Sequence, residues 1–293
     1  MGEGHAVSVP AGPFGIAGGR LEVHQVPAGR DNLVWVIAAP AHGEAAIVDG
    51  PDAEGALALC DARGWRVAAV LNTHTHGDHV GVNRDLARRG RLGGVRVVGP
   101  ARAAAGVPGL TEAVDEGDRV ALWGVAMEVL RTEGHLDGHV SYVVGEALFC
   151  GDTLFGAGCG YLFDGPAAKM HASLARLAAL AGEPLVCCAH EYTWDNLRFA
   201  WSVEPDNAAL AERIRAARVA RAAGRSLVPS TVALERATNP FLRGEVPTLR
   251  AAAAAALGRC DTDRLDGLAV FTALRALKDT GAYRAIADGA MPG

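Results

Sequence analysis

The chain has 293 residues, of which 50% are hydrophobic and 21% charged, with a formal net charge of −5. This profile excludes a disordered chain, and it provides no basic surface for nucleic acid or an anionic membrane. No stretch approaches the roughly 20 apolar residues that cross a bilayer. We expect no secretory signal, because Met1 to Arg20 has no basic start followed by a long apolar run. The six cysteines form no Cys-x-x-Cys pair. We therefore expect a cytoplasmic protein with reduced thiols that binds neither nucleic acid nor membrane.

Seven short apolar runs predict β-strands over the first two thirds of the chain, because they are mostly rich in Val, Leu or Ile and bounded by Gly, Pro or Asp. They are Leu33–Ala38, Ala45–Asp49, Val67–Leu71, Val95–Gly99, Val125–Leu130, Ser141–Val144 and Ala147–Cys150. Two segments between them, Ala53–Arg63 and Val80–Arg89, have the length and composition of helices. The alternation predicts an α/β fold in which helices cover sheets.

Near Glu191 the composition changes to Ala, Arg and Leu with few β-branched residues, which favours helices. The predicted helices are Asp195–Trp201, Asn207–Ala223, Ser230–Thr238, Thr248–Leu257 and Thr262–Lys278. We therefore expect two domains, residues 1–192 and residues 193–293, of which the second is mainly helical.

A histidine-rich loop follows the third predicted strand, with His74, His76, Asp78 and His79 inside six residues. Imidazole and carboxylate are the ligand types that bind zinc, iron or manganese in proteins. In an extended segment, positions two apart project to the same side, so His74 and His76 can hold one ion together. Asp78 and His79 come after the chain turns at Gly77 and can therefore serve a second ion. The loop predicts a metal site with room for two neighbouring ions.

Three further candidate ligands lie downstream, each just after a predicted strand: His135, Asp152 and His190. Taken singly, a histidine in such a position is more often a structural hydrogen-bonding residue. Their occurrence together, in order after the histidine-rich loop, indicates that they complete the same site. We interpret His139, four residues past His135, as structural or supporting and not as a ligand.

The segment Thr73–His79 followed by His135, Asp152 and His190 resembles the ligand pattern of the metallo-β-lactamase superfamily. The resemblance implies a four-layer αββα sandwich over residues 1–192 that binds two divalent metal ions. One ion would be held by His74, His76 and His135, the second by Asp78, His79 and His190, and Asp152 would bridge the two. Zinc is expected first, although iron and manganese also suit this ligand set.

Asp49 ends a predicted strand and matches the first motif of the same superfamily. The resemblance implies that its carboxylate orients a ligand histidine without binding a metal itself. The alternative is a turn aspartate with no role in the site.

Five further strings are similar to glyoxalase II, the hydroxyacylglutathione hydrolases. They are Gly151–Phe155, Gly158–Gly160, Ala189–Thr193, Asn196–Ala200 and Asn239–Arg243. The resemblance implies that residues 193–293 form a substrate-binding domain, and it matches Tyr192, Arg275 and Lys278 to glutathione contacts. Solvated helix charges are the alternative interpretation of Arg275 and Lys278.

Two positions depart from the glyoxalase II pattern. Tyr161 stands where the family usually has a basic residue, and Phe163 stands where it often has a glutathione-binding tyrosine. Tyr161 remains a candidate substrate contact, but the departures leave the identity of the thiol carrier open.

The resemblance implies hydrolysis of S-D-lactoylglutathione to glutathione and D-lactate, a step of methylglyoxal detoxification. A hydroxide bridging the two metals would attack the thioester carbonyl, and Asp78 and Asp152 would position that hydroxide as well as bind metal. The alternatives are a persulfide dioxygenase with a single iron and a hydrolase of a different thioester or ester. A glutathione thioester is the expected small-molecule partner, and the protein would be a monomer or homodimer.

Overall fold

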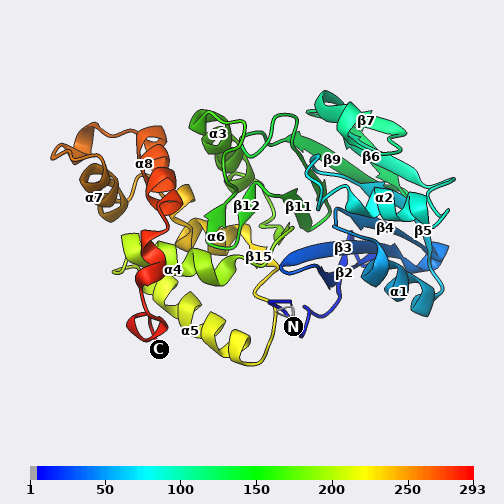
Figure 1. Cartoon of the computed structure of the whole chain (residues 1–293), viewed down its shortest axis with the longest axis horizontal. Helices are drawn as coiled ribbons and strands as arrows, with labels where there is room; N and C mark the ends of the chain where they lie inside the picture. The colour runs from blue at the N-terminus through cyan, green and yellow to red at the C-terminus, as the bar shows by residue number, and fades with distance from the viewer. Residues whose placement is uncertain (1–4) are drawn as a thin grey trace.

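Two β-sheets stack at the centre of the structure, a computed structural model that describes residues 5–293, the side chain of Asp263 excepted (Figure 1). The first sheet has the order β1-β2-β3-β4-β5-β6-β7 and the second the order β15-β14-β11-β10-β9-β8. The strands of the first sheet are β1 (Phe14–Ile16), β2 (Leu21–Ala28), β3 (Asn32–Ala39), β4 (Glu44–Val48), β5 (Arg66–Leu71), β6 (Arg96–Pro100) and β7 (Glu112–Val114). Those of the second are β8 (Arg119–Leu122), β9 (Val125–Arg131), β10 (Val140–Val144), β11 (Ala147–Gly151), β14 (Leu185–Cys188) and β15 (Ser230–Thr231).

The residues of β3 alternate between two hydrophobic cores, as expected for a strand covered on both faces. Leu33, Trp35 and Ile37 belong to the core between the sheets. Val34 and Val36 belong to a separate core on the other face of the strand. The helices α1 (Glu54–Arg63) and α2 (Gly81–Arg88) contribute to that outer core.

Helix α3 (Ala167–Ala178) lies beside the second sheet (Figure 1), and its Met170, Leu174 and Leu177 are buried in one hydrophobic cluster with residues of that sheet. The layers therefore run helix, sheet, sheet, helix, which confirms the predicted αββα arrangement. No helix in the described part of the chain is long and apolar enough to cross a membrane.

The C-terminal part is mainly helical, as predicted, and gathers at one end of the molecule (Figure 1). Its helices are α4 (Thr193–Val203), α5 (Ala208–Ala222), α6 (Val232–Thr238), α7 (Pro247–Ala256) and α8 (Gly267–Asp279). The helix predicted from Thr262 begins later than expected. Residues Thr262–Arg264 form a 3-10 turn, and Asp266 caps α8 by accepting a hydrogen bond from the backbone N–H of Ala269 at 2.8 Å.

All seven predicted strands are present, but several strands were not predicted from the sequence. The longest strand that was not predicted is the eight-residue β2. Its sequence contains Glu22, His24, Gln25 and Pro27, which are not typical of a strand. His24 and Gln25 are nevertheless buried. Polar residues hide the alternation by which a half-buried strand is identified, and Pro27 argues against a strand.

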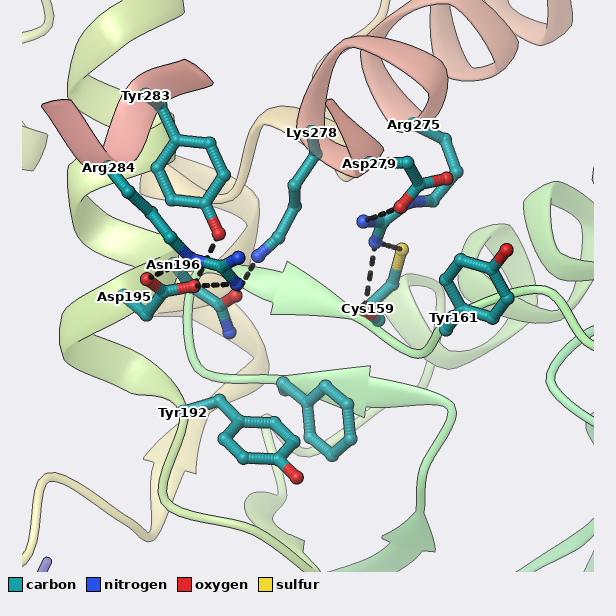
Figure 2. A pocket seen from close by; sticks show the side chains of 11 residues that line it. Cys159, Tyr161, Tyr192, Asp195, Asn196, Arg275, Lys278, Asp279, Tyr283 and Arg284 are labelled. Atoms are coloured by element: carbon teal, nitrogen blue, oxygen red, sulfur yellow. Dashed lines mark hydrogen bonds and ion pairs between the residues drawn. The ribbon is translucent and has the colours of Figure 1, made fainter. Parts of the chain in front are cut away.

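A small hairpin formed by β12 (Leu154–Phe155) and β13 (Gly158–Cys159) connects the sheets to the C-terminal helices (Figure 2). The backbone N–H of Ala157 at its turn donates to the Glu235 carboxylate at 2.8 Å. The side chain of Asn239 donates to the carbonyl of Gly158 at 2.9 Å. Helix α6 and the residue after it therefore fix the position of this hairpin.

Glu235 is fully buried and is neutralised by Arg213 of α5, which also donates to Ser230 and Thr238. Removing one partner of a buried ion pair leaves an uncompensated charge. We expect Arg213→Met to lower the free energy of unfolding by about 3–5 kcal/mol, measured by urea denaturation at equal metal content. Arg88→Met serves as the control, since its side chain is 71% exposed and its pairing with Asp85 contributes little. Equal losses for the two variants would contradict this account.

Candidate metal centre

The predicted ligands lie after the carboxyl ends of four strands that the two sheets bring together. The histidine-rich loop follows β5, and His135 follows β9 after a short loop. Asp152 and His190 follow β11 and β14, which are parallel neighbours in the second sheet. Parallel strands end at the same edge of a sheet, so these segments converge at one place. His139, by contrast, accepts a hydrogen bond at Nε2 from the backbone N–H of Asp152 at 3.3 Å, and so contacts the backbone of a candidate ligand.

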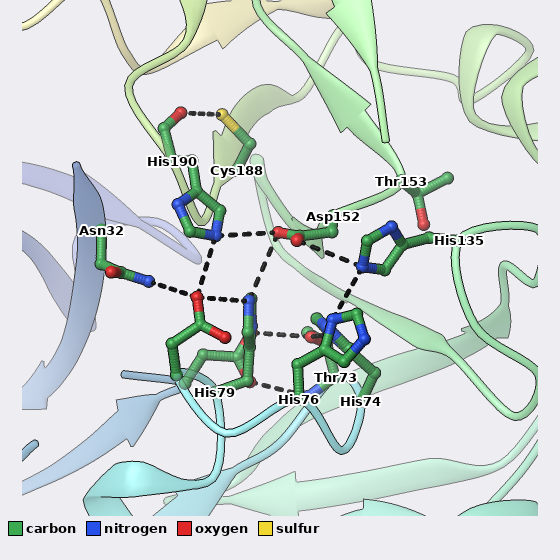
Figure 3. A network of polar contacts seen from close by, with 12 residues as sticks. Asn32, Thr73, His74, His76, His79, His135, Asp152, Thr153, Cys188 and His190 are labelled. Atoms are coloured by element: carbon green, nitrogen blue, oxygen red, sulfur yellow. Dashed lines mark hydrogen bonds and ion pairs between the residues drawn. The ribbon is translucent and has the colours of Figure 1, made fainter. Parts of the chain in front are cut away.

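Three imidazole nitrogens form the first half of the centre (Figure 3). Nδ1 of His76 lies 3.1 Å from Nε2 of His74 and 3.0 Å from Nε2 of His135. Ligands of a tetrahedral ion at about 2.0–2.1 Å would be separated by roughly 3.3 Å. The three nitrogens therefore converge as ligands of one ion would.

The second half of the centre consists of Asp78, His79 and His190. Nε2 of His190 lies 3.4 Å from Oδ2 of Asp78, and Nε2 of His79 lies 3.8 Å from the same oxygen. Ligand atoms of these three residues lie within 4.8 Å of one another, as do those of the first three histidines with Asp152. The chain therefore offers two adjacent groups of metal-binding atoms.

The carboxylate of Asp152 lies between the two halves. Its Oδ2 is 3.3 Å from Nε2 of His135 in the first half, and its Oδ1 is 3.5 Å from Nε2 of both His79 and His190 in the second. Among the described residues, Oδ1 of Asp152 and Nε2 of His79 are buried without a hydrogen-bond partner. Unpartnered buried polar atoms are costly, and a divalent cation would satisfy both. The residues present therefore fit a bound metal.

Four of the candidate ligand histidines have an outer partner at Nδ1, which leaves Nε2 facing the centre. Nδ1 of His74 lies 3.0 Å from Oγ1 of Thr73, and Nδ1 of His79 lies 3.0 Å from Oδ2 of Asp49. Nδ1 of His135 lies 2.8 Å from the carbonyl oxygen of Tyr161, and Nδ1 of His190 lies 2.8 Å from Oδ1 of Asp31. Asn32 likewise donates to Oδ2 of Asp78 at 3.0 Å.

Asp49 therefore lies where the resemblance placed it. Besides contacting His79, it accepts hydrogen bonds from the backbone N–H and the hydroxyl of Thr73 at 2.8 and 2.7 Å. Its backbone φ is +53°, an uncommon value for a residue other than glycine. Asp31, Asn32 and the carbonyl of Tyr161 were not identified from the sequence.

The electrostatics of the centre favour a cation. Burial lowers the pKa of His74 well below its usual value, so this imidazole is neutral and its nitrogen is available to a metal. Burial also disfavours a charge on His79, but the carboxylates of Asp152 and Asp49 outweigh it and raise its pKa well above the usual value. A divalent ion bound at Nε2 requires a neutral imidazole, so metal binding and protonation compete at His79.

A cavity of about 350 Å³ lies between the hairpin and the C-terminal helices (Figure 2). It is lined by Phe155, Cys159, Tyr161, Tyr192, Asp195, Asn196, Arg275, Lys278, Asp279, Tyr283 and Arg284. The ring of Tyr192 stacks on that of His190, with centroids 4.8 Å apart and planes 6° apart. The cavity therefore adjoins the second half of the metal centre.

The structure brings all four predicted substrate contacts to this cavity, and neither cation of α8 is a solvated helix charge. The exposed fraction is 6% for Arg275 and 9% for Lys278. Arg275 donates to the carbonyl of Cys159 at 3.2 Å, and Lys278 donates to Asn196. Burial, followed by the neighbouring Arg275, lowers the pKa of Lys278 to about 8.

Cys159 lies at the wall of the cavity but is not a reactive thiol. Burial raises its pKa, although Arg275 opposes the shift. The flanking glycines allow close packing, since a Cβ on Gly158 would lie 2.4 Å from the Asn196 side chain and one on Gly160 would lie 2.0 Å from the carbonyl of Asp152. The close approach of these neighbours accounts for the glycines on either side of Cys159.

Comparison with known proteins gives two family matches that together cover most of the chain. The model described as Metallo-beta-lactamase superfamily matches residues 28–190. The model described as Hydroxyacylglutathione hydrolase C-terminus matches residues 191–281.

Two relatives and one solved structure illustrate the similarity. The hydroxyacylglutathione hydrolase of Methylococcus capsulatus is 47% identical over 233 residues, which are 79% of this chain and 90% of the relative. That of Gloeobacter violaceus is 46% identical over 259 residues, or 88% and 98% of the two chains. The crystal structure of ETHE1 from Myxococcus xanthus superposes with a TM-score of 0.57 at 25% identity, covering 76% of this chain and 84% of that one.

The outer partners generate a prediction about metal affinity. Asp31→Ala removes the acceptor that fixes His190, so we expect the affinity for Zn²⁺ to fall by roughly 10–100-fold in competition with a chromophoric chelator. Asp31→Asn keeps an acceptor oxygen and should lose less. Asp61→Ala is the control, because that exposed carboxylate pairs with Arg91 away from the centre. Unchanged affinity in Asp31→Ala would show that this contact does not orient the ligand.

Proposed function

The chain belongs to the hydroxyacylglutathione hydrolase family of the metallo-β-lactamase superfamily, and on this basis we propose that it hydrolyses S-D-lactoylglutathione to glutathione and D-lactate. The observation that carries the proposal is the position of the carboxylate of Asp152 between two groups of metal-binding atoms, beside a cavity with two buried cations. Residues 1–192 would supply catalysis, and residues 193–293 would supply most of the binding site for the thiol carrier.

We propose that the centre holds two divalent ions, zinc first. His74, His76 and His135 would hold one, and Asp78, His79 and His190 the other, with Asp152 shared. When bound, the ions supply a Lewis acid for the carbonyl oxygen and lower the pKa of water to near neutral. The donor set of nitrogen and carboxylate oxygen suits zinc, iron and manganese alike.

The chain's own carboxylates would position the nucleophile. Asp78 and Asp152 both point oxygen atoms into the centre, where they can accept hydrogen bonds from the attacking water and hold it in line with the carbonyl carbon. The attacking water loses one proton to solvent and its oxygen bonds to the thioester carbon. The C–S bond then breaks with its electron pair going to sulfur, which leaves as a thiolate, and the carboxylic acid formed loses its proton to solvent. A thiolate is a stable leaving group, so no side chain need donate a proton to it.

The cavity would bind the thiol carrier. Arg275 and Lys278 are buried cations three residues apart on α8, which suits them to a carboxylate at the end of a peptide such as glutathione. Tyr192 lies against His190 and Phe155, between this end of the cavity and the metal centre. The reacting sulfur would pass beside its ring.

The alternative of a persulfide dioxygenase with one iron is less supported. The relatives at 46–47% identity are named as hydroxyacylglutathione hydrolases, and the match to the family's C-terminal part extends to residue 281. A hydrolase of a different thioester remains the second candidate, because Tyr161 and Phe163 depart from the family pattern.

A hydrolysis panel tests the proposed function directly. Metal-loaded protein would be assayed with S-D-lactoylglutathione, S-lactoyl coenzyme A and a β-lactam, with free thiol and oxygen uptake followed together. We expect thiol release from the glutathione thioester without oxygen consumption and at least tenfold lower kcat/KM for the other two. Oxygen uptake, or preference for either other substrate, would overturn the proposal.

The shared position of Asp152 gives a prediction about metal content. Asp152→Ala should reduce the bound metal, measured by elemental analysis of dialysed protein, from two ions per chain to one or none. It should also lower kcat for the glutathione thioester by at least 10³-fold, as expected for loss of metal-assisted attack. Asp61→Ala again serves as the control. A variant with wild-type metal content and rate would rule out the shared role.

Lys278 gives a prediction about pH. Burial lowers the pKa of Lys278 to about 8, so in the protein without substrate its side chain is a charged ammonium below that pH and a neutral amine above it. The cation therefore contributes to carboxylate binding at low pH, and kcat/KM should fall as pH rises through about 8. Lys278→Met should have a lower kcat/KM that no longer falls as pH rises through about 8. Lys278→Arg should retain the decrease in kcat/KM but at a higher pH. An identical profile in Lys278→Met would remove Lys278 from the binding site.

A further inference from the structure

Three aromatic side chains at the active site are unusually exposed. The exposed fraction is 52% for Tyr161, 59% for Phe163 and 37% for Tyr192. Within the described part of the chain, no other aromatic residue is among the exposed large hydrophobic side chains. Exposed apolar groups that cluster at one place indicate a surface that a ligand covers.

Phe163 lies over the first half of the metal centre. Its ring centroid is 5.1 Å from that of His76 and 5.2 Å from that of His135, in edge-to-face geometry. It is not among the residues that line the carrier cavity, whereas its neighbour Tyr161 is. The two rings contact each other, with centroids 4.9 Å apart and planes 64° apart. The aromatic surface therefore begins at the cavity and extends over the metal ligands.

The backbone holds this surface in place. The N–H groups of Phe163 and Asp164 donate to the carbonyl of His135 at 3.1 and 3.4 Å, and the carbonyl of Tyr161 accepts from Nδ1 of the same histidine at 2.8 Å. Three hydrogen bonds thus attach the segment to one metal ligand. A segment whose backbone is already held by hydrogen bonds needs less ordering when a ligand covers its side chains.

The direction of the substrate follows from the proposed function, on which this inference rests. The thioester carbonyl must reach the metal centre, and the thiol carrier occupies the cavity toward Arg275 and Lys278. Phe163 lies over the first half of the metal centre and outside the lining of the carrier cavity, so an acyl group that extends beyond the carbonyl can reach its ring. The ring also lacks the hydroxyl with which the family's tyrosine would contact glutathione. A lactoyl group offers a single methyl to this ring, whereas an aryl group would pack against it.

We propose that Tyr161 and Phe163 form an acyl-binding surface that selects glutathione thioesters whose 2-hydroxyacyl group carries an aromatic ring. The phenyl ring of such a group would lie on Phe163, and Tyr161 would support Phe163 from the carrier side. An aromatic pair contributes beyond the area it buries, which makes the phenyl group a better occupant than an alkyl group.

The test compares S-mandeloylglutathione with S-D-lactoylglutathione on the same protein samples, since the ratio of their kcat/KM values is independent of the active fraction. In the wild type this ratio should exceed one. Phe163→Ala should lower it by roughly fivefold, the size of one aromatic contact. Phe163→Tyr keeps the ring and should retain the ratio, and Leu257→Ala, an exposed apolar residue at the end of α7, is the matched control.

Each outcome is decisive. A wild-type ratio of one or below, or a ratio unchanged in Phe163→Ala, overturns the acyl-binding surface while leaving thioester hydrolysis intact. Failure to hydrolyse either thioester contradicts the proposed function instead. A ratio that falls equally in Leu257→Ala would assign the effect to general destabilisation and also overturn the proposal.

Discussion

The buried carboxylate of Asp152 is the constraint on which the rest of the structure depends. A charge at this depth is unstable unless cations lie close to both of its oxygens. Imidazoles from two sides face it, and burial keeps one of them, His74, neutral. Two sheets must therefore end at the same place so that four separate segments supply ligands around one aspartate. The stacked sheets and the order of their strands meet this requirement.

One short segment connects the metal centre with the substrate site. The β12–β13 hairpin and the loop after it contribute the carbonyl of Cys159, which accepts from Arg275, and the carbonyl of Tyr161, which accepts from His135. Glu235 fixes the turn of that hairpin from the C-terminal helices. The helices that would bind the carrier are thus coupled through the backbone to a metal ligand. A substitution in α6 or α8 can therefore affect the metal centre without touching it.

The candidate ligands could be picked out from the sequence because each follows a recognisable strand and four of them form one short loop. Their outer partners could not. Asp31 reaches His190 across 159 positions of sequence, and the acceptor for His135 is a backbone carbonyl with no side-chain signature. The burial of Arg275 was equally hidden, because helix spacing does not reveal that a hairpin packs against it. The sequence therefore indicated the candidate ligand residues, whereas the partners that orient their side chains come from tertiary contacts.

The central claim is that Asp152 lies between two metal ions. The most direct measurement is anomalous diffraction from crystals of the full chain grown with zinc, recorded above and below the zinc absorption edge. The account predicts two anomalous peaks about 3.5–4 Å apart, one among His74, His76 and His135 and one among Asp78, His79 and His190, with an oxygen of Asp152 near each. A single peak, or two peaks that both lie away from Asp152, would contradict it.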